Sequence, residues 1–341
     1  MKWSSFLCNF ASEILRFVTV LESIQLPIAE DLSRFNNVFQ QTLKHDNPLL
    51  KVALEHLAKR KGKQMRPILT ILSARLCGKV NDSVLNAAVG LELLHTASLV
   101  HDDVVDESNR RRGQQSLNAL MDNKVSVLVG DYLLSRALYH VSLTENIKVF
   151  TSVSNLGQIL ADGELVQLHN IDSDKFDEGS YYEIISKKTA SLFAACAQFG
   201  TLLGGGSDDD VERMRQFGKL IGMCFQLRDD IFDYDRTTDV GKPSGNDMRE
   251  GQLTLPVIFA INKGKDPGVI AKAKAVREGS ASKEDIEHLI QYTKNMGGLQ
   301  YAEWAIDEFR MMADGLIKEG KDPAIAKSLH DFVAYVAQRL V

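Results

Sequence analysis

Three aspartates close an apolar stretch of the sequence, and the same spacing recurs far downstream. The first group ends the run ELLHTASLVHDDVVDESNRRRG, which spans residues 92–113, and the second lies in FQLRDDIFDY. On a helix, residues three or four positions apart share a face, so each group projects its carboxylates to one side. We therefore expect two half-sites that face each other across a cavity. Their members are Asp102, Asp103 and Asp106, and Asp229, Asp230 and Asp233.

Like charges on neighbouring helical turns repel each other unless a cation lies between them. Carboxylate oxygens with room for water and phosphate oxygens are the ligands that Mg²⁺ prefers. Basic residues near such a centre indicate that something anionic lies between the two, and carboxylate-held Mg²⁺ with nearby arginine and lysine is how proteins bind a diphosphate. The candidate basic residues are Lys63, Arg66, Arg111, Arg112, Lys188 and Lys242.

The composition is that of an ordinary globular protein. The chain has 341 residues, 44% of them hydrophobic and 25% charged, and its net charge of −5 does not suggest a nucleic-acid binder. Its four cysteines form no metal-binding or paired spacing, which favours reduced thiols and a cytoplasmic location. The uncharged run of residues 3–12 is too short to span a membrane. We expect residues 1–27 to form a helical N-terminal extension and residues 28–341 a single domain.

Helical periodicity runs through almost the whole chain, and no sustained alternation of period two is present. The sequence therefore predicts an all-α fold, a single large helical bundle with a central active-site cavity. Two polar loops, residues 107–115 and 236–251, directly follow the aspartate groups and are candidate lids. The expected helices span residues 28–44, 48–60, 67–76, 82–106, 124–142, 147–169, 180–203, 209–234, 254–262, 283–295, 299–317 and 323–339.

Taken together, these motifs resemble those of the trans-isoprenyl diphosphate synthases, the polyprenyl synthetase family with the isoprenoid synthase fold. HDDVVD with RRRG resembles the first aspartate-rich motif, and FQLRDDIFD resembles the second. KGKQMRP resembles the segment that binds isopentenyl diphosphate, and VGKPSGNDMREGQLTLP resembles the stretch after the second motif. The resemblance runs from about residue 28 to the C-terminus, in family order.

The resemblance implies a role for each matching residue. The six aspartates would hold Mg²⁺, three ions in all, with Asp102, Asp106 and Asp229 as the direct ligands. Lys188 would also act in catalysis. The residues that would contact the allylic substrate are Arg111, Lys188, Thr189, Gln226 and Lys242. Those that would hold isopentenyl diphosphate are Lys63, Arg66, His95 and Arg112. One position departs from the family pattern, because Gln252 stands where the family usually has lysine, and this removes one charge contact with the allylic diphosphate.

The expected product is a long all-trans polyprenyl diphosphate of the octaprenyl or solanesyl kind. A growing apolar chain needs a tunnel, and the helix that enters Asp102 would supply one wall. Ala97 and Ser98, about one turn deeper, are small, as is Gly90 further up, so no aromatic side chain blocks the tunnel near its mouth. Each open turn rises about 5 Å, roughly the reach of one isoprene unit. The alternative is that Ala97 and Ser98 are small only for helix packing.

Several other functions share part of this pattern. A terpene cyclase also uses a first aspartate motif, but it needs no second diphosphate site, and its second motif normally mixes Asn, Ser or Thr with Glu. Head-to-head synthases of the squalene type usually space their aspartates differently. A shorter-chain geranylgeranyl diphosphate synthase and a subunit of a heteromeric prenyl synthase remain alternatives. By resemblance we expect a homodimer. Because the product is lipid-like, we also expect transient membrane contact during its release.

Overall fold

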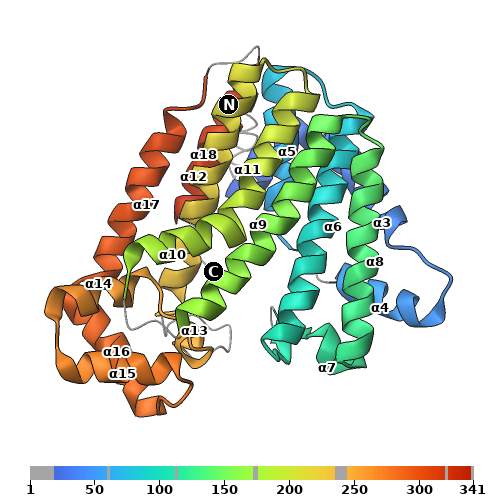
Figure 1. Cartoon of the computed structure of the whole chain (residues 1–341). Helices are drawn as coiled ribbons and strands as arrows, with labels where there is room; N and C mark the ends of the chain where they lie inside the picture. Colours follow the sequence, from blue (N-terminus) through green and yellow to red (C-terminus); the bar gives the residue numbers. More distant parts are fainter. Residues whose placement is uncertain are drawn as a thin grey trace, which may run out of the picture.

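The computed structural model describes residues 19–59, 62–111, 114–171, 176–234, 244–318 and 322–338. Arg112, Lys242 and the first 18 residues of the predicted extension therefore lie outside the described residues. The described part is almost entirely helical (Figure 1). The long helices run side by side, and shorter helices gather at one end of the bundle (Figure 1).

The first half of the chain contains α2 (Val20–Gln25), η1 (Leu26–Ile28), α3 (Ala29–Thr42), α4 (Pro48–Lys59), α5 (Met65–Cys77), α6 (Asp82–Val105), β1 (Arg110–Arg111), β2 (Gln114–Gln115), α7 (Leu117–Met121), α8 (Asn123–Ser142) and α9 (Ile147–Ile171). The second half contains α10 (Glu178–Ile185), η2 (Ser186–Ala190), α11 (Ser191–Leu203), α12 (Asp208–Phe232), α13 (Asn246–Arg249), α14 (Leu255–Gly264), α15 (Pro267–Arg277), α16 (Lys283–Met296), α17 (Gly298–Asp314) and α18 (Pro323–Gln338).

The two helices that carry the aspartates begin with side-chain caps. Asn81 accepts a hydrogen bond from the Val84 amide at the start of α6, and Ser207 accepts one from the Asp210 amide at the start of α12. At their other ends, Asp106 and Asp233 are the C-cap residues. A carboxylate at a helix C-terminus faces the negative end of the helix dipole. Both motifs thus lie where negative charge accumulates, which increases their need for a cation.

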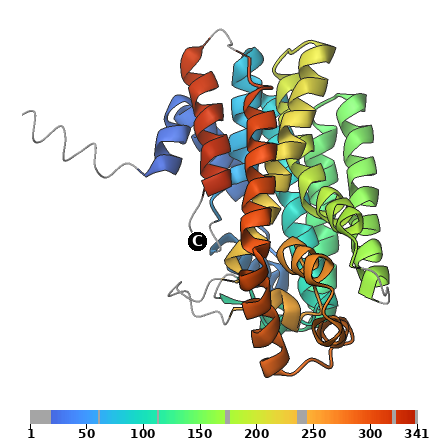
Figure 2. The same ribbon diagram turned by 90° about the vertical axis from the view of Figure 1, so that its left-hand side faces the viewer.

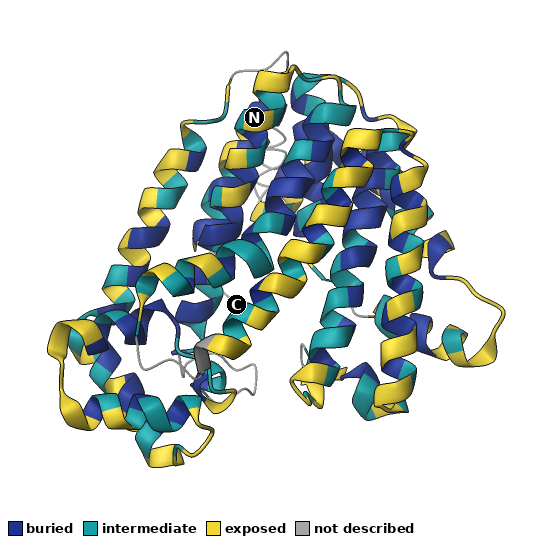
Figure 3. Cartoon of the chain, in the orientation of Figure 1, coloured by how far each residue is buried: buried dark blue, intermediate teal, exposed yellow. Residues whose placement is uncertain are grey.

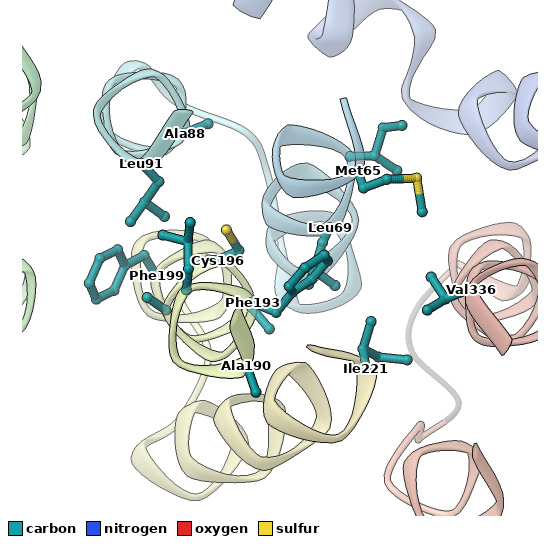
Figure 4. Packing of buried hydrophobic residues seen from close by; sticks show 14 of the residues in the cluster. Met65, Leu69, Ala88, Leu91, Ala190, Phe193, Cys196, Phe199, Ile221 and Val336 are labelled. Carbon is teal, nitrogen blue, oxygen red and sulfur yellow. The ribbon is translucent and has the colours of Figure 1, made fainter. Parts of the chain in front are cut away.

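The core is divided between the long bundle and a smaller group of helices. Figure 3 shows the buried faces of the long helices turned inward, with exposed residues on the outside. In Figure 4, Phe193 and Cys196 of α11 lie among side chains from α5, α6 and α12. A second hydrophobic cluster joins α13, α14, α15 and α16, which lie together at the lower end in Figure 1. The long bundle therefore supports the ends of α6 and α12, and the smaller cluster packs beside the second motif.

The N-terminal and C-terminal helices meet on one flank of the bundle. α18 packs against α2, α5, α12 and α17, and Figure 2 shows α17 and α18 beside each other. Ile24 of α2 is fully buried in the main core. The described part of the predicted extension is therefore helical and packs onto the bundle.

The structure differs from the sequence-based expectation at three kinds of place. α7, α13 and α15 were not predicted, and two short antiparallel strands pair Arg110 with Gln115 and Arg111 with Gln114 inside the loop of residues 107–115. The expected helix of residues 180–203 is interrupted by a π-helical turn, η2. Among the described helices, α6 alone is long and apolar enough to cross a membrane, and it is largely buried within the protein, as the core helix of a globular fold would be.

Candidate active site

The first aspartate motif lies at the end of α6, beside the β1–β2 hairpin. Asp103 is buried, and its Oδ1 accepts a hydrogen bond of 2.5 Å from Nε of Arg111. Asn118 of α7 donates to the Asp103 carbonyl at 3.1 Å, which fixes the end of the helix. Among the residues that the structure describes, the second oxygen of Asp103 is buried and has no hydrogen-bond partner. Asp103 thus holds Arg111 at the site, and its unpaired oxygen marks a place where a water or a cation would be stabilised.

In the other two aspartates of this motif, burial and neighbouring acids disfavour the charged form of the carboxyl group. Burial raises the pKa of Asp102 to about 6, Glu164 and Asp106 add to the increase, and Lys188 and Arg111 oppose it. Burial also raises the pKa of Asp106, again with Glu164 opposing ionisation and Lys188 favouring it. A divalent cation beside these carboxylates would offset that cost of ionisation and favour their charged form.

The second motif contains a carboxylate held on both oxygens. Asp230 is buried, the Tyr181 hydroxyl donates to its Oδ2 at 2.5 Å, and Gln226 donates to its Oδ1 at 2.8 Å. Burial raises the pKa of Asp230 to about 7, although these two hydrogen bonds oppose the increase. Asp230 is therefore positioned by α10 and by its own helix.

Asp233 is held in a different way, by the backbone of the segment that returns to the site. Its carboxylate accepts hydrogen bonds from the amides of Asn246 at 2.8 Å and Asp247 at 3.1 Å, and its carbonyl accepts one from Gly245 at 2.8 Å. The Asp247 side chain adds a further carboxylate to this cluster. Burial raises its pKa well above the ordinary value, and Asp233 and Asp230 add to the increase.

These contacts separate the aspartates into two groups. Asp103, Asp230 and Asp233 already receive hydrogen bonds from protein donors. Within the described part of the chain, the carboxylates of Asp102 and Asp106 receive none. A set of hard carboxylate oxygens, partly free of protein donors and raised in pKa, fits Mg²⁺. In the first motif, Asp102 and Asp106 are therefore the residues whose carboxylates would be available to such an ion.

Lys188 connects the two motifs. It affects the pKa of Asp102 and Asp106, and it lines a cavity of about 190 Å³ together with Asp230. Its neighbour Thr189 donates to Gln226 at 2.8 Å, and both residues line the same cavity. Lys188 and Thr189 belong to the π-helical turn, a feature that often reorients side chains at functional sites. The structure therefore brings Lys188, Thr189 and Gln226 together, and Gln252 also lines this cavity.

Three of the four residues predicted to hold isopentenyl diphosphate are described: Lys63 and Arg66 lie at the start of α5 or just before it, and His95 lies on α6. Arg66 is in the first turn of α5, and its guanidinium lies 4.9 Å from the ring centroid of Phe193. Lys63 lies just before α5, with its ammonium 5.9 Å from the ring centroid of Tyr335. His95 is half-buried on α6, two turns before Asp102.

The predicted chain-length residues lie on different parts of α6. Ala97 is buried, and Ser98 is half-buried and donates to the His95 carbonyl at 2.9 Å. For Gly90 the prediction was wrong. A Cβ there would lie 2.8 Å from a methyl group of Val141 and 3.2 Å from the Ala137 carbonyl, both on α8. Gly90 is small because α8 packs against it, and not because it lines a tunnel.

Four further residues at the site were missed by the sequence reasoning. Glu164 and Gln167 of α9 contact the Lys188 ammonium, Tyr181 binds Asp230, and Asp247 joins the second cluster. The polar pair of Glu164 and Gln167, three positions apart on one face of an otherwise amphipathic helix, was a usable signal. Tyr181 had no signal of its own, because its role depends on how α10 packs.

Similarity to known proteins identifies the family of this chain. Residues 47–293 match the family model described as Polyprenyl synthetase. The chain belongs to the polyprenyl synthetase family. It is therefore a prenyltransferase.

Three relatives illustrate the range within this family. The octaprenyl diphosphate synthase of Haemophilus influenzae is 33% identical over 283 residues, which cover 83% of this chain and 86% of that protein. The structure of a geranylgeranyl pyrophosphate synthase from Bacteroides thetaiotaomicron is 43% identical, with a TM-score of 0.82 and coverage of 93% of this chain and 99% of that one. A polyprenyl synthase from Caulobacter crescentus, solved with calcium and isoprenyl diphosphate, is 29% identical, with a TM-score of 0.87 and coverage of 94% and 98%.

Proposed function

We propose that this chain is a long-chain all-trans polyprenyl diphosphate synthase. It adds isopentenyl diphosphate units to a farnesyl or geranylgeranyl diphosphate primer and supplies side chains for quinones. The observation that carries the proposal is the position of Lys188, which acts electrostatically on the first aspartate motif and shares a cavity with the second. One cation between two carboxylate clusters suits a diphosphate bound through divalent metal ions.

The roles of the residues follow from the charge that develops in the reaction. Mg²⁺, three ions in all, would when bound act as a Lewis acid on the oxygens of the leaving diphosphate. Arg111, held by Asp103, and Lys188 stabilise the remaining charge of that group. Lys63, Arg66 and His95 hold isopentenyl diphosphate so that its alkene reaches the allylic cation. Arg112 also holds isopentenyl diphosphate, and Lys242 also contacts the allylic diphosphate. Both residues lie outside the described residues.

The remaining steps need little more from the protein. After the new carbon–carbon bond forms, the departing diphosphate accepts the proton that is lost, so no dedicated protein base is required. Water would quench the allylic cation, so the site must be dry during turnover. Asp230 and Asp233 position the second motif through Tyr181, Gln226 and the backbone of α13.

The long product is the part of the proposal most open to an alternative. The octaprenyl synthase of Haemophilus influenzae and the small residues Ala97 and Ser98 favour a long chain. The 43% identity to a structure described as a geranylgeranyl pyrophosphate synthase favours a shorter one. The test is to incubate purified protein with Mg²⁺, farnesyl diphosphate and labelled isopentenyl diphosphate, and to measure product length by chromatography. We expect products of about eight isoprene units; a product of four units would establish the alternative, and no elongation would indicate dependence on a partner subunit.

We also propose a homodimer that forms through α8 and α9. Both helices expose several large apolar side chains to solvent. Exposed apolar patches of this kind mark protein interfaces, because burying them in a dimer removes them from water. The exposed side chains include Leu128 and Tyr139 of α8, Ile147, Phe150 and Leu165 of α9, and Leu143, which directly follows α8. The mass in solution, measured by light scattering, tests this arrangement. We further propose a cytoplasmic enzyme that contacts membranes transiently when it releases product, and turnover that is indifferent to lipid vesicles would contradict that contact.

A further inference from the structure

A short stretch of α9 holds both lysines of the π-helical turn. The Lys187 ammonium contacts Asp162 at 2.7 Å and Glu183 at 2.5 Å. The Lys188 ammonium forms an ion pair with Glu164 and donates to Gln167 Oε1 at 2.9 Å. Both lysine side chains are about three-quarters buried, with exposures of 25% and 26%. Asp162 and Glu164, two positions apart on α9, thus pair with the adjacent lysines of η2.

Gly163, between these two acids, lets η2 approach α9 closely. A Cβ at this position would lie 2.8 Å from Lys187 Cβ and 3.3 Å from the Lys188 amide nitrogen. These atoms belong to the backbone or to the root of a side chain, so they cannot move aside without shifting η2. At Gly157, six positions earlier on the same helix, no other part of the described chain comes within 4 Å of the equivalent position, apart from the adjoining backbone of α9.

The geometry leaves Lys188 ready to bind an anion. An ammonium has three donor hydrogens, and Glu164 and Gln167 take two of them. No acceptor for the third is found within the described ranges, which leaves it for a group in the cavity that Lys188 lines with Thr189 and Gln226. A lysine side chain that is already ordered loses less conformational entropy when it binds a ligand.

We propose that Gly163, Glu164 and Gln167 are positioning residues that hold the Lys188 ammonium toward the diphosphate of the allylic substrate. The inference rests on the proposed role of Lys188 in binding that diphosphate. Glu164 acts here through its contact with Lys188, and it does not need to touch the substrate.

The first test compares substitutions at Glu164 and measures the two substrates separately. Glu164→Ala should raise KM for farnesyl diphosphate about three- to tenfold, the range expected when a long side chain must be ordered on binding. KM for isopentenyl diphosphate should stay within about twofold, since the ordering cost falls on the allylic site alone. Glu164→Gln, which keeps an acceptor oxygen for the ammonium, should recover part of the loss. Equal increases for both substrates, or an unchanged KM in the Ala variant, would overturn the proposal.

The second test uses the two glycines of α9 as a matched pair. Gly163→Ala should weaken binding of a non-ionising analogue, farnesyl thiodiphosphate, measured by calorimetry in the presence of Mg²⁺. Gly157→Ala should leave that binding unchanged. If both variants bind the analogue as the wild type does, close packing of η2 does not position Lys188. Thermal unfolding of both variants shows whether Gly163→Ala is folded. If it is not, the Glu164 substitutions test the positioning of Lys188 instead.

A double-mutant cycle separates this proposal from the proposed function. If Lys188→Met weakens analogue binding and Glu164→Ala adds nothing in that background, the two residues act through one contact. If the two losses add, Glu164 acts independently of Lys188 and the positioning role is wrong. If Lys188→Met has no effect on analogue binding, the assigned role of Lys188 itself fails.

Discussion

The hydrogen bond from Tyr181 to Asp230 provides a sharp test of how the second motif is held. Asp230 is 3% exposed, and Tyr181, itself 6% exposed, donates to it at 2.5 Å. Tyr181→Phe removes only the hydroxyl and leaves the ring in place. Gln226 would then be the one remaining side-chain donor to this carboxylate among the described residues.

The size of the effect follows from the charge on Asp230. A hydrogen bond to a charged group contributes about 1.5–3 kcal/mol, and a buried carboxylate that loses it is left partly unsatisfied. Because the bond opposes the rise in pKa that burial causes, its loss raises the pKa of Asp230 above its present value of about 7. More of the metal-free enzyme would then be protonated at neutral pH. Metal binding must displace that proton, so we expect the Mg²⁺ concentration for half-maximal activity to rise by about tenfold or more at pH 7.

The assay is a Mg²⁺ titration of initial rates at several pH values, with Tyr182→Phe as the matched control. Tyr182 is adjacent, half-buried, and packs its ring against Tyr181 and Phe309. The difference between Tyr181→Phe and wild type should shrink as the pH rises above the pKa of Asp230, because the proton competes less. An unchanged Mg²⁺ requirement in Tyr181→Phe, or an equal change in Tyr182→Phe, would refute the reasoning.

Three further predictions concern product length, substrate affinity and acid stability. Ser98→Phe should shorten the product by at least one isoprene unit, since the new ring fills space one turn below Asp102; chromatography that shows the wild-type length would contradict the tunnel assignment. Gln252→Lys should lower KM for the allylic diphosphate by about two- to fivefold through one added charge contact in the cavity that Gln252 lines, and an unchanged KM would place residue 252 outside that contact. Burial lowers the pKa of His140 to about 4 from an ordinary value of 6.5, so its contribution to stability is complete above about pH 6.5 and is lost as the pH falls toward 4. The free energy of unfolding should drop by up to about 3 kcal/mol over that window, and His140→Asn should flatten the slope measured by urea unfolding.

Local signals were sufficient to predict the helices that carry the chemistry. Asn81 and Ser207 are ordinary N-cap residues, and the observed starts of α6 and α12 match the expected ones to within one residue. No helix was expected between residues 262 and 283, where the structure has α15. In the structure Asp266 caps the helix and Pro267 is its first residue, which is the preferred place for both.

Other features depend on packing between distant segments, which spacing cannot reveal. The π-helical turn at Lys188 lies against Gly163 of α9, and no pattern within residues 180–203 indicated it. The two adjacent aspartates, Asp229 and Asp230, look equivalent in sequence. Only the packing of α10, which brings the Tyr181 hydroxyl within hydrogen-bond distance of Asp230, shows that the protein positions this carboxylate. Gly90 was misassigned for the same reason, because the face of α6 that meets α8 is fixed by tertiary structure.

The central claim is that both aspartate motifs hold one diphosphate through Mg²⁺. The most direct measurement is the calorimetric affinity of inorganic diphosphate for the wild type, Asp102→Ala, Asp229→Ala and the double variant, with Mg²⁺ and with excess EDTA. We expect the wild type to bind diphosphate tightly only when Mg²⁺ is present, each single variant to lose most of this affinity, and the double variant to lose little more. Undiminished binding in EDTA, or a loss confined to one motif, would contradict it.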